Sequence, residues 1–156
     1  MKYDYDIIVV GGGHAGMEAA FASAHMGLNT LLITLNFEKI SNMPCNPSIG
    51  GSAKGIVVRE VDALGGMMGI CADEGALQIK FLNTGKGPGV QCLRAQEDKL
   101  NYPRVVQRYA FNTPNLTLKE GMVIDLLHDD ERVFGVRLKD QDIYSKAVIL
   151  TTGTYM

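Results

Sequence analysis

The chain has 156 residues, a formal net charge of -2 and 46% hydrophobic residues, which is an ordinary globular composition. The near-neutral charge excludes a globally basic surface for nucleic acid, so any such contact must be local. No stretch approaches the roughly 18 consecutive apolar residues of a membrane span, and the chain starts directly with a predicted strand rather than a signal peptide. We therefore expect a cytoplasmic protein without membrane contact.

The three cysteines form no disulfide or metal-binding pattern. Cys45, Cys71 and Cys92 are an odd set without a CxxC pair, which argues against a disulfide framework or a zinc site. Cys71 and Cys92 have apolar or small neighbours and are predicted to be packed thiols. No metal site is predicted.

The first predicted element is a buried strand over residues 7–10 that leads through three glycines into a helix. Gly11 permits a sharp turn, Gly13 carries no Cβ to hold a diphosphate away, and Gly16 lets the helix approach the strand. The free N–H groups at the start of the helix would then face the negative charge of the ligand. Because the dinucleotide fingerprint requires a glycine turn between a strand and a helix, we predict a pyrophosphate cradle. Its residues are Gly11, Gly12, Gly13, His14, Ala15 and Gly16.

The second predicted strand covers residues 30–34, after a helix that ends near Gly27. In a unit that binds NAD or FAD, an acidic residue usually follows this strand and bonds the ribose hydroxyls. Asn36 stands there instead, and Glu38 follows two residues later. The amide of Asn36 is a candidate for the ribose contact, although a plain strand end explains an asparagine equally well.

The middle of the chain is predicted to hold two helices between irregular segments. Prolines and glycines interrupt residues 35–52 and 67–90, for which we predict no regular structure. One helix is predicted over residues 53–64, and a second over residues 94–112 with a kink or break at Pro103. In the first of these helices the expected inward residues are Ile56, Val57, Val61 and Leu64, and the expected outward ones are Lys54, Arg59, Glu60 and Asp62.

The last third of the chain is predicted to be a small meander followed by a strand. Short apolar runs at residues 116–118, 123–127, 133–138 and 143–144 are separated by turn residues, which predicts antiparallel strands. Residues 147–151 form a further apolar strand that leads towards Gly153. The order of elements predicts an α/β class: a Rossmann-like fold with a parallel sheet, helices and a small antiparallel β-meander.

This order of elements is similar to that of the flavoproteins with two dinucleotide-binding domains. The similarity implies FAD rather than NAD, because the meander crossover belongs to that class. It also implies that Val123, which opens the strand after the third parallel strand, contacts the adenine through its backbone. The turn at Thr152 and Gly153 would come back to the cofactor.

A second informative segment surrounds Cys45. Pro44 and Pro47 fix an extended path on either side of this cysteine. Gly50 and Gly51 then lead into a helix start, whose backbone donors are expected to lie across from the first glycine turn as further cofactor contacts. A thiol on a rigid loop near a helix N-terminus and a lysine should favour the thiolate, so Cys45 is the candidate catalytic residue. The alternative is a buried structural cysteine.

Several blocks of the chain stand out together: residues 11–16, 45–51, 60–66, 81–83 with 86–88, and 94–96. They closely resemble the MnmG family, also called GidA, of FAD-dependent enzymes that modify the wobble uridine of certain tRNAs. The resemblance runs nearly end to end, and the Cys-Asn-Pro and Lys-Gly-Pro blocks are specific to this family. The family also lacks the acidic residue after the second strand, which accounts for Asn36.

The resemblance implies an activity and a set of partners. Members of the family work with the GTPase MnmE and place an aminomethyl or carboxymethylaminomethyl group on C5 of uridine 34 of a tRNA. Methylene-tetrahydrofolate is the carbon donor, NADH reduces the flavin, and the full-length enzyme is expected to be a homodimer. Residues 1–156 would be the N-terminal part of an FAD-binding domain, inactive alone, with an NADH-binding insertion and a helical partner-binding region beyond residue 156.

The resemblance also suggests roles for particular side chains. Cys45 is the candidate thiol that engages the uracil or the one-carbon unit. The candidates for tRNA phosphate or folate carboxylate contacts are Lys80, Lys86, Arg94 and Arg104. A solvated helix face explains Arg104 and Arg108 just as well.

Two other kinds of function remain open at this point. One is a different flavin enzyme. A small-molecule or disulfide oxidoreductase would be supported by a redox CxxC, and a folate- and FAD-dependent tRNA uridine methyltransferase would be expected to have an acid after the second strand and no Cys-Asn-Pro block. The other is a non-catalytic nucleotide-binding fragment, which the flavin absorbance of the purified chain would distinguish.

Overall fold

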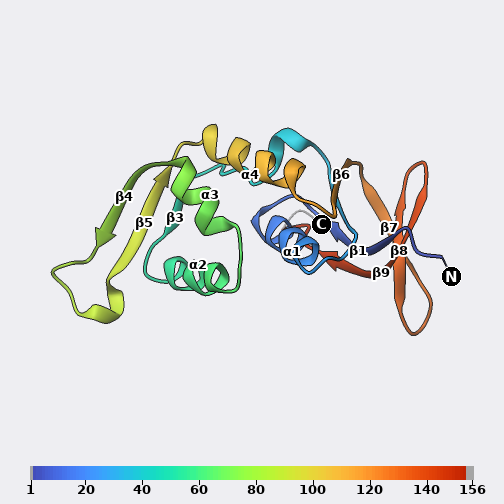
Figure 1. Ribbon diagram of the computed structural model, residues 1–156, viewed down its shortest axis with the longest axis horizontal. Helices are drawn as coiled ribbons and strands as arrows, with labels where there is room; N and C mark the ends of the chain where they lie inside the picture. The colour runs from blue at the N-terminus through green and yellow to red at the C-terminus, as the bar shows by residue number, and fades with distance from the viewer. Residues whose placement is uncertain (1, 154–156) are drawn as a thin grey trace. The chain divides into compact units, whose positions relative to one another are not determined.

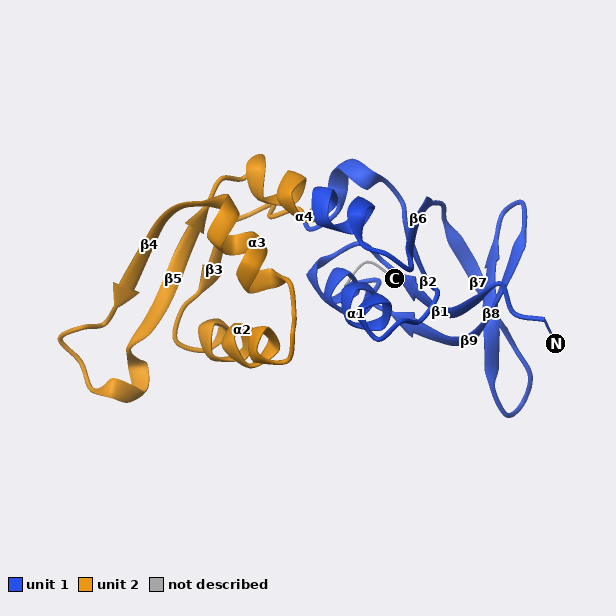
Figure 2. Cartoon of the chain, viewed as in Figure 1, with its two compact units in different colours: residues 1–41, 107–156 blue, residues 42–106 orange. Residues whose placement is uncertain are grey.

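The computed structural model describes residues 2–153, which fall into two compact units (Figure 1, Figure 2). Unit 1 comprises residues 1–41 and 107–156, and unit 2 comprises residues 42–106. Helix α4 (Asn101–Asn112) supplies residues to both units. Within residues 2–153 no helix has the length and apolar character needed to cross a membrane.

Unit 1 is built on a mixed sheet with the strand order β6-β2-β1-β9-β8-β7. The first four of these strands pair in parallel, and β7, β8 and β9 pair antiparallel. Helix α1 (His14–His25) connects β1 to β2 and packs against both. The predicted α/β class, with a parallel sheet, helices and a small antiparallel meander, is confirmed. The strands are β1 (Tyr5–Val10), β2 (Thr30–Thr34), β6 (Leu116–Glu120), β7 (Val123–His128), β8 (Val133–Leu138) and β9 (Asp142–Leu150).

The parallel strands of unit 1 are covered on both faces. Because side chains alternate along a strand, Ile8 and Val10 of β1 point to one face and Val9 points to the other. The first face packs against the meander in one apolar cluster. Its buried members are Ile8, Val10, Leu31, Ile33, Val136, Leu138 and Ile143. Helix α1 buries Met17 and Phe21. Burial on both sides explains the unbroken apolar runs of β1 and β2.

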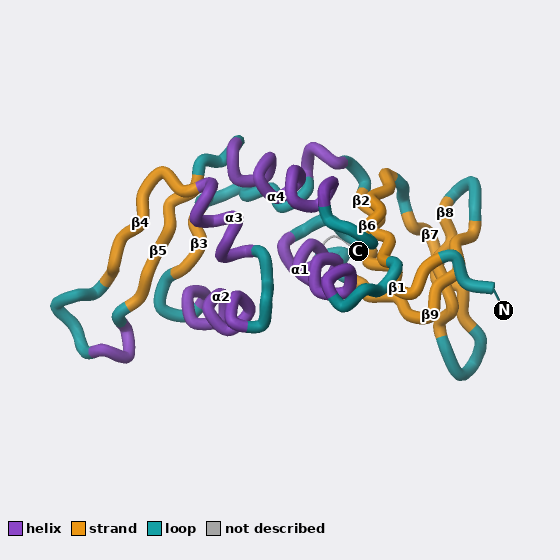
Figure 3. The backbone as a smooth tube through the Cα atoms, in the orientation of Figure 1, coloured by secondary structure: helices purple, strands orange, loops and turns teal. Residues whose placement is uncertain are grey.

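Two strands of unit 1 differ from the prediction. The sequence assigns residues 116–118 to the meander, but β6 pairs in parallel with β2. The sequence also separates a strand at residues 143–144 from one at 147–151, whereas β9 is continuous (Figure 3). Its start pairs antiparallel with β8, and from Ser145 onwards it pairs in parallel with β1. Lys146 interrupts the apolar run, but its neighbours Ser145 and Ala147 pair with β1, and its Nζ forms an ion pair with Asp6 of β1 at 2.6 Å.

Unit 2 holds an antiparallel sheet of order β3-β5-β4, with two helices in contact with it. The strands are β3 (Ser48–Gly50), β4 (Ala76–Leu82) and β5 (Cys92–Glu97), the helices are α2 (Lys54–Ala63) and α3 (Met68–Gly75), and a 3-10 turn covers Pro88–Val90. The prediction of irregular structure is therefore wrong at residues 48–50 and 68–82, and the prediction of helix is wrong at 94–97. Residues 40–47 and 83–87 contain no helix or strand, as predicted. The pairing of β3 with β5 joins segments distant in the sequence, and the pairing of β4 with β5 spans a connection of nine residues; local composition reveals neither.

The sequence pattern assigns the wrong face of α2 to the interior. The residues that line the space between this helix and the sheet are Gly55, Val58, Arg59 and Asp62, which follow the helical spacing of three and four. Of the four residues predicted inward, Ile56, Val57 and Leu64 are 54%, 56% and 89% exposed, and Val61 is half-buried. A Cβ on Gly55 would lie 3.3 Å from Leu93 O. The close approach that glycine permits, rather than the apolar period, sets the orientation of α2.

Pro103 does not break α4. The helix begins at Asn101, so Pro103 lies in its first turn, where a missing N–H removes no intrahelical hydrogen bond. Asp98 caps the helix, because its Oδ1 accepts hydrogen bonds from the N–H groups of Leu100 and Asn101, each at 2.8 Å. These hydrogen bonds hold the pKa of Asp98 below its usual range.

Candidate functional site

The predicted cradle is the turn between β1 and α1. Gly11 has a φ of +110°, and its N–H donates to Ile33 O at 2.8 Å. A Cβ on Gly11 would lie 2.5 Å from Thr151 O, and one on Gly12 would lie 2.7 Å from Thr34 Oγ1. Both positions therefore require glycine, because the turn is packed against the residues that end β2 and follow β9.

Gly13 and Gly16 have opposite surroundings. Gly13 is the N-cap of α1 and is exposed, and a Cβ there would meet no atom within 4 Å. A Cβ on Gly16 would collide with Gly11 O and would lie 2.6 Å from Thr151 Oγ1. Gly16 thus serves the packing of α1 on the turn, whereas Gly13 keeps the approach to the helix start open.

The first turn of α1 has the properties of an anion site. It holds no acidic residue, and no side chain caps it. Ala15 is exposed, while the Nε2 atom of His14 is buried, so this nitrogen is not presented at the surface. The N–H groups at a helix start carry partial positive charge and suit phosphate oxygens. The geometry of the turn therefore fits the predicted pyrophosphate cradle.

Substitution of Gly16 by alanine is expected to damage the fold as well as the cradle. The new Cβ has no room between Gly11 O and Thr151 Oγ1, so the free energy of unfolding should fall by about 3 kcal/mol. Urea denaturation followed by circular dichroism measures this change. Gly13→Ala is the matched control, since its Cβ enters open space, and equal loss in both variants would contradict the packing role of Gly16.

Thr151, which follows β9, packs against the glycine turn, although it lies about 140 residues further along the chain. The hydroxyl of Thr151 lies 2.9 Å from Val10 O and 3.1 Å from Gly11 O, and its N–H also donates to Val10 O at 2.9 Å. Thr152 and Gly153 follow and are exposed. They lie beyond the carboxyl end of a parallel strand, the edge at which such sheets bind ligands. Their contact with a cofactor stays a prediction, as does that of Val123, which is half-buried and opens β7 opposite Leu138.

Asn36 caps the short 3-10 turn Phe37–Lys39 that follows β2. Its Oδ1 accepts a hydrogen bond from Glu38 N at 2.7 Å, so its Nδ2 is the group left to offer a ribose hydroxyl. Glu120, at the end of β6, lies opposite Thr34, and its Oε1 accepts from Phe37 N at 2.7 Å. Through this hydrogen bond, Glu120 of the neighbouring strand β6 anchors the loop that follows β2. Sequence reasoning missed it, because only the parallel pairing of β6 with β2 brings it there.

Cys45 lies in an exposed segment of unit 2 whose two flanking prolines are held by β5 and the residues after it. Lys99 Nζ donates to Pro44 O at 2.8 Å. Gln96 Nε2 donates to Pro47 O at 2.8 Å, and the backbone N–H of the next residue donates to the same oxygen at 2.8 Å. The thiol is exposed, so the alternative of a buried structural cysteine is wrong. The supporting residues Gln96 and Lys99 had no predicted role, because their partners are backbone carbonyls distant in the sequence.

The glycines after this segment have structural reasons of their own. Gly50 and Gly51 have φ values of +113° and +96°, and Gly51 N donates to Leu93 O at 2.9 Å. A Cβ on Gly50 would collide with the same carbonyl. Lys54, which opens α2, donates from Nζ to Ser48 O at 3.0 Å. The contacts of Gly50 and Gly51 with a cofactor, and the thiolate character of Cys45, stay predictions.

The other predicted side chains occupy different places. Cys71 and Cys92 are buried, which confirms the prediction that they are packed thiols. Lys80 and Arg94 lie directly opposite one another on β4 and β5. Lys86 is exposed in the connection between these strands, and Arg104 is exposed on α4.

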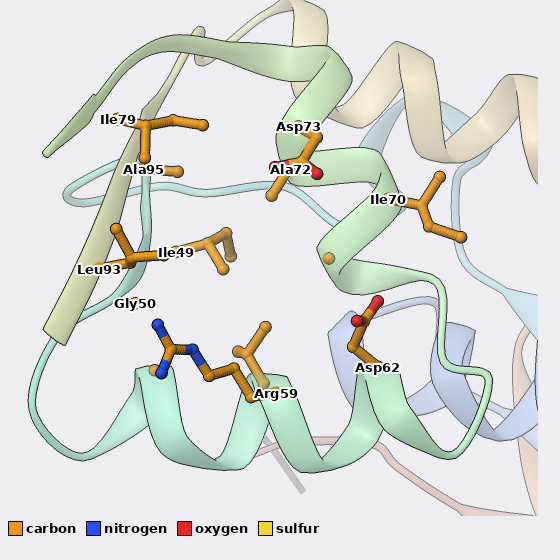
Figure 4. Close-up of a pocket in the computed structure, with 13 residues that line it drawn as sticks. Ile49, Gly50, Arg59, Asp62, Ile70, Ala72, Asp73, Ile79, Leu93 and Ala95 are labelled. Carbon is orange, nitrogen blue, oxygen red and sulfur yellow. The ribbon is translucent and has the colours of Figure 1, made fainter. Parts of the chain in front are cut away.

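An open cavity of about 260 Å³ lies in unit 2, between α2, α3 and one face of the sheet (Figure 4). Its sheet wall is apolar and includes Ile49 and Leu93. Figure 4 shows Arg59 extending from α2 towards Gly50 and Leu93, with Asp62 rising from the same helix towards α3. The face of the sheet that is turned towards α2 and α3 therefore forms one wall of the cavity.

Glu97, at the end of β5, is a fully buried carboxylate. It is 1% exposed, and within residues 2–153 neither side-chain oxygen has a hydrogen-bond partner. A Cβ on Gly75 of α3 would lie 2.9 Å from its Oε2. Burial, with a smaller contribution from the nearby charge of Asp73, raises the pKa of Glu97 to about 7. At neutral pH this group is therefore close to its own titration point.

The stability of the protein is expected to fall between pH 4.5 and about 7 because of Glu97. In this window the folded state holds the Glu97 proton and the unfolded chain does not, so the free energy of unfolding falls as the pH rises. Above about pH 7 Glu97 is ionised in both states, and its destabilising effect no longer changes with pH. The loss amounts to about 3 kcal/mol at about 1.4 kcal/mol per pKa unit. Urea unfolding at pH 5 and pH 8 should show Glu97→Gln more stable than the parent only at the higher pH. The exposed Glu60→Gln serves as control, and an unchanged pH profile in Glu97→Gln would contradict the assignment.

The parallel sheet of unit 1 and the glycine turn before α1 define a Rossmann-like α/β protein with a dinucleotide-type cradle. Comparison with known proteins makes the assignment particular. The family model described as "Glucose inhibited division protein A" matches residues 6–156, and the chain belongs to that family.

Individual relatives agree with the family match. The tRNA uridine 5-carboxymethylaminomethyl modification enzymes MnmG of Acholeplasma laidlawii and of Lactococcus lactis subsp. cremoris are 58% and 57% identical to the chain, over 97% of its length. The solved structure of Aquifex aeolicus GidA in the form I crystal has a TM-score of 0.94 at 48% identity, again over 97% of the chain. The chain spans 25% of the length of the two curated relatives and 26% of the solved chain.

Proposed function

We propose that residues 1–156 are the N-terminal part of the FAD-binding domain of a tRNA-modifying enzyme. The enzyme adds an aminomethyl or carboxymethylaminomethyl group to C5 of the wobble uridine 34. The observation that supports this most is the cradle, in which the open Gly13 stands at the start of α1 on a turn that Gly11, Gly12 and Gly16 pack tightly. The substrate comes from the relatives, which are named tRNA uridine 5-carboxymethylaminomethyl modification enzymes.

The residues of unit 1 fit a flavin dinucleotide. The N–H groups of the first turn of α1 would hold the pyrophosphate, and the Nδ2 of Asn36 would donate to a ribose hydroxyl. The backbone of Val123 would contact the adenine. Further contacts are proposed for His14, Ala15, Thr152 and Gly153 of unit 1 and, separately, for Gly50 and Gly51 of unit 2. When bound, FAD supplies the redox chemistry of the reaction, with NADH as the reductant.

Cys45 is proposed to activate the uracil. C5 of uracil is a poor nucleophile, and addition of the thiolate to C6 moves the C5–C6 electron pair onto C5 as an enolate. C5 can then form a bond to the electrophilic methylene carbon of methylene-tetrahydrofolate, and a free amine displaces the tetrahydrofolate nitrogen from that carbon, which releases tetrahydrofolate and supplies the amino group of the product. Loss of the C5 proton to a base and departure of the thiolate restore the double bond. The exposed thiol and the two anchored proline carbonyls around it support this role.

The proposed enzyme needs partners and further parts of its chain. We propose the GTPase MnmE as the partner, a homodimer as the assembly and the cytoplasm as the location. An NADH-binding insertion and a helical partner-binding region would lie beyond residue 156, because the curated relatives are about four times as long as this chain.

The test uses the full-length protein with MnmE, GTP, NADH, methylene-tetrahydrofolate, an amine donor (ammonium or glycine) and unmodified tRNA. We expect the purified protein to show flavin absorbance and the digested tRNA to contain the aminomethyl or carboxymethylaminomethyl uridine by mass spectrometry. Appearance of 5-methyluridine would favour the methyltransferase alternative. Absence of flavin in the full-length protein would overturn the proposal.

A further inference from the structure

The sheet of unit 2 has two faces of different character. Ile49, Ile79, Leu93 and Ala95 line the cavity under α2 and α3. Because neighbouring residues in a strand point to opposite sides, the residues between them belong to the other face. That face is defined by the paired positions Ser48, Gly50, Gln78, Lys80, Leu82, Cys92, Arg94 and Gln96, and we call it the cationic face. Gly50 belongs to it by its pairing with Arg94, while its backbone also borders the cavity.

The cationic face carries two positive charges side by side. Lys80 and Arg94 are direct cross-strand partners, and Gly50, which has no side chain, completes the row. Side chains directly opposite in an antiparallel pair stand about 5 Å apart at Cβ, where like charges repel each other. Within residues 2–153 neither cation has an ion pair or hydrogen bond to relieve this repulsion, and none of the eight positions is acidic.

This distribution of charge is local. The whole chain carries a formal net charge of -2, so a face with two cations and no acid departs from its average. Lys80 is exposed and Arg94 is half-buried, so an anion has access to both. A partner with closely spaced negative charges would turn the unfavourable pair into a favourable one.

The cationic face is continuous with the Cys45 segment. Gln96 belongs to the row next to Lys80 and Arg94, and its Nε2 donates to Pro47 O at 2.8 Å. An extended polyanion that crosses the two cations would therefore pass the loop that presents the thiol. The spacing of adjacent phosphates in a single RNA strand suits two neighbouring cations.

From this juxtaposition we propose that Lys80 and Arg94 form a binding site for the phosphodiester backbone of the RNA substrate, beside the proposed nucleophile Cys45. The inference rests on the proposed function, because it names where that enzyme holds its tRNA. Arg94 bridges phosphate oxygens through its planar guanidinium, and Lys80 acts as a mobile point charge. Neither residue reads a base, so the contact fixes the position of the tRNA rather than its identity.

The experiment compares tRNA binding by the full-length, FAD-loaded protein and a Lys80→Gln/Arg94→Gln double variant over a range of salt concentrations. Loss of two phosphate contacts should raise the Kd for tRNA about tenfold and make the slope of log K against log salt shallower by about 1.5. Lys80→Arg/Arg94→Lys keeps both charges and should restore binding to within about threefold of the parent. Arg132→Gln/Lys139→Gln removes the same charge from exposed residues of unit 1 and should leave Kd and slope unchanged.

The outcomes separate this inference from the proposed function. Unchanged Kd and salt slope in the double variant, while the parent binds and modifies tRNA, would overturn the RNA site alone. Loss of flavin absorbance in the double variant with intact tRNA binding would assign the two cations to the phosphates of the cofactor and would also overturn it. A parent that neither binds nor modifies tRNA would overturn the proposed function and the RNA site together.

Discussion

Replacing Gly13 by valine is expected to weaken FAD binding strongly while the fold remains intact. The Gly13 backbone has φ -73° and ψ -178°, an extended conformation open to any residue, and a Cβ there meets no protein atom within 4 Å. The added side chain would instead occupy the approach to the first turn of α1. We expect the Kd for FAD in the full-length protein to rise about a hundredfold, with a change in Tm of at most about 2 °C.

Gly87→Val is the matched control for this experiment. Gly87 has φ -57° and ψ 153°, and a Cβ there also meets nothing within 4 Å. Flavin fluorescence quenching gives the Kd, and a thermal melt of the apoprotein gives Tm. Normal FAD affinity in Gly13→Val would show that the turn is not the pyrophosphate cradle. A large fall in Tm would show that Gly13 serves packing instead.

Replacing Cys45 by serine is expected to lower tRNA modification by roughly a thousandfold, because the hydroxyl is a far weaker nucleophile than a thiolate. The side chain is exposed, and the hydrogen bonds that hold its segment go to the carbonyls of Pro44 and Pro47. Serine therefore leaves the loop in place. FAD content and tRNA affinity should stay at parental values, and mass spectrometry of digested tRNA measures the loss of product.

Cys71→Ala supplies the comparison, since it removes a thiol that is buried in α3. This variant should lose stability rather than the chemical step, with activity per folded molecule unchanged. Normal modification by Cys45→Ser, with normal FAD content, would exclude Cys45 as the nucleophile.

The sequence predicted the elements of unit 1 well because each of them is specified locally. The apolar run before Gly11 and the small residues after Gly13 are sufficient to define a strand, a turn and a helix. The parallel pairing of β6 and the continuity of β9 were not predictable in this way. Both depend on partners that lie far away along the chain, such as Asp6 for Lys146.

Unit 2 was predicted poorly for the same reason. The strands β3, β4 and β5 contain turn residues and charges, and they exist because they pair with each other. The predicted inward face of α2 was wrong. Gly55 allows the helix to approach the sheet closely, and the period of the apolar residues carries no information about such an approach. The supports of the candidate site, Glu120, Gln96 and Lys99, bond to backbone atoms, and no motif announces such contacts.

The hydroxyl of Thr151 bears on the order of events while the protein is being made. It lies within hydrogen-bonding distance of the carbonyls of Val10 and Gly11. The glycine turn, which is synthesised first, therefore gains this contact only when a residue about 140 positions later has been made. Until β9 has been synthesised and has paired with β1, Gly11 and Gly16 lack their packing contacts with Thr151. Binding of a nucleotide by the growing polypeptide would therefore begin only after β9 has been synthesised.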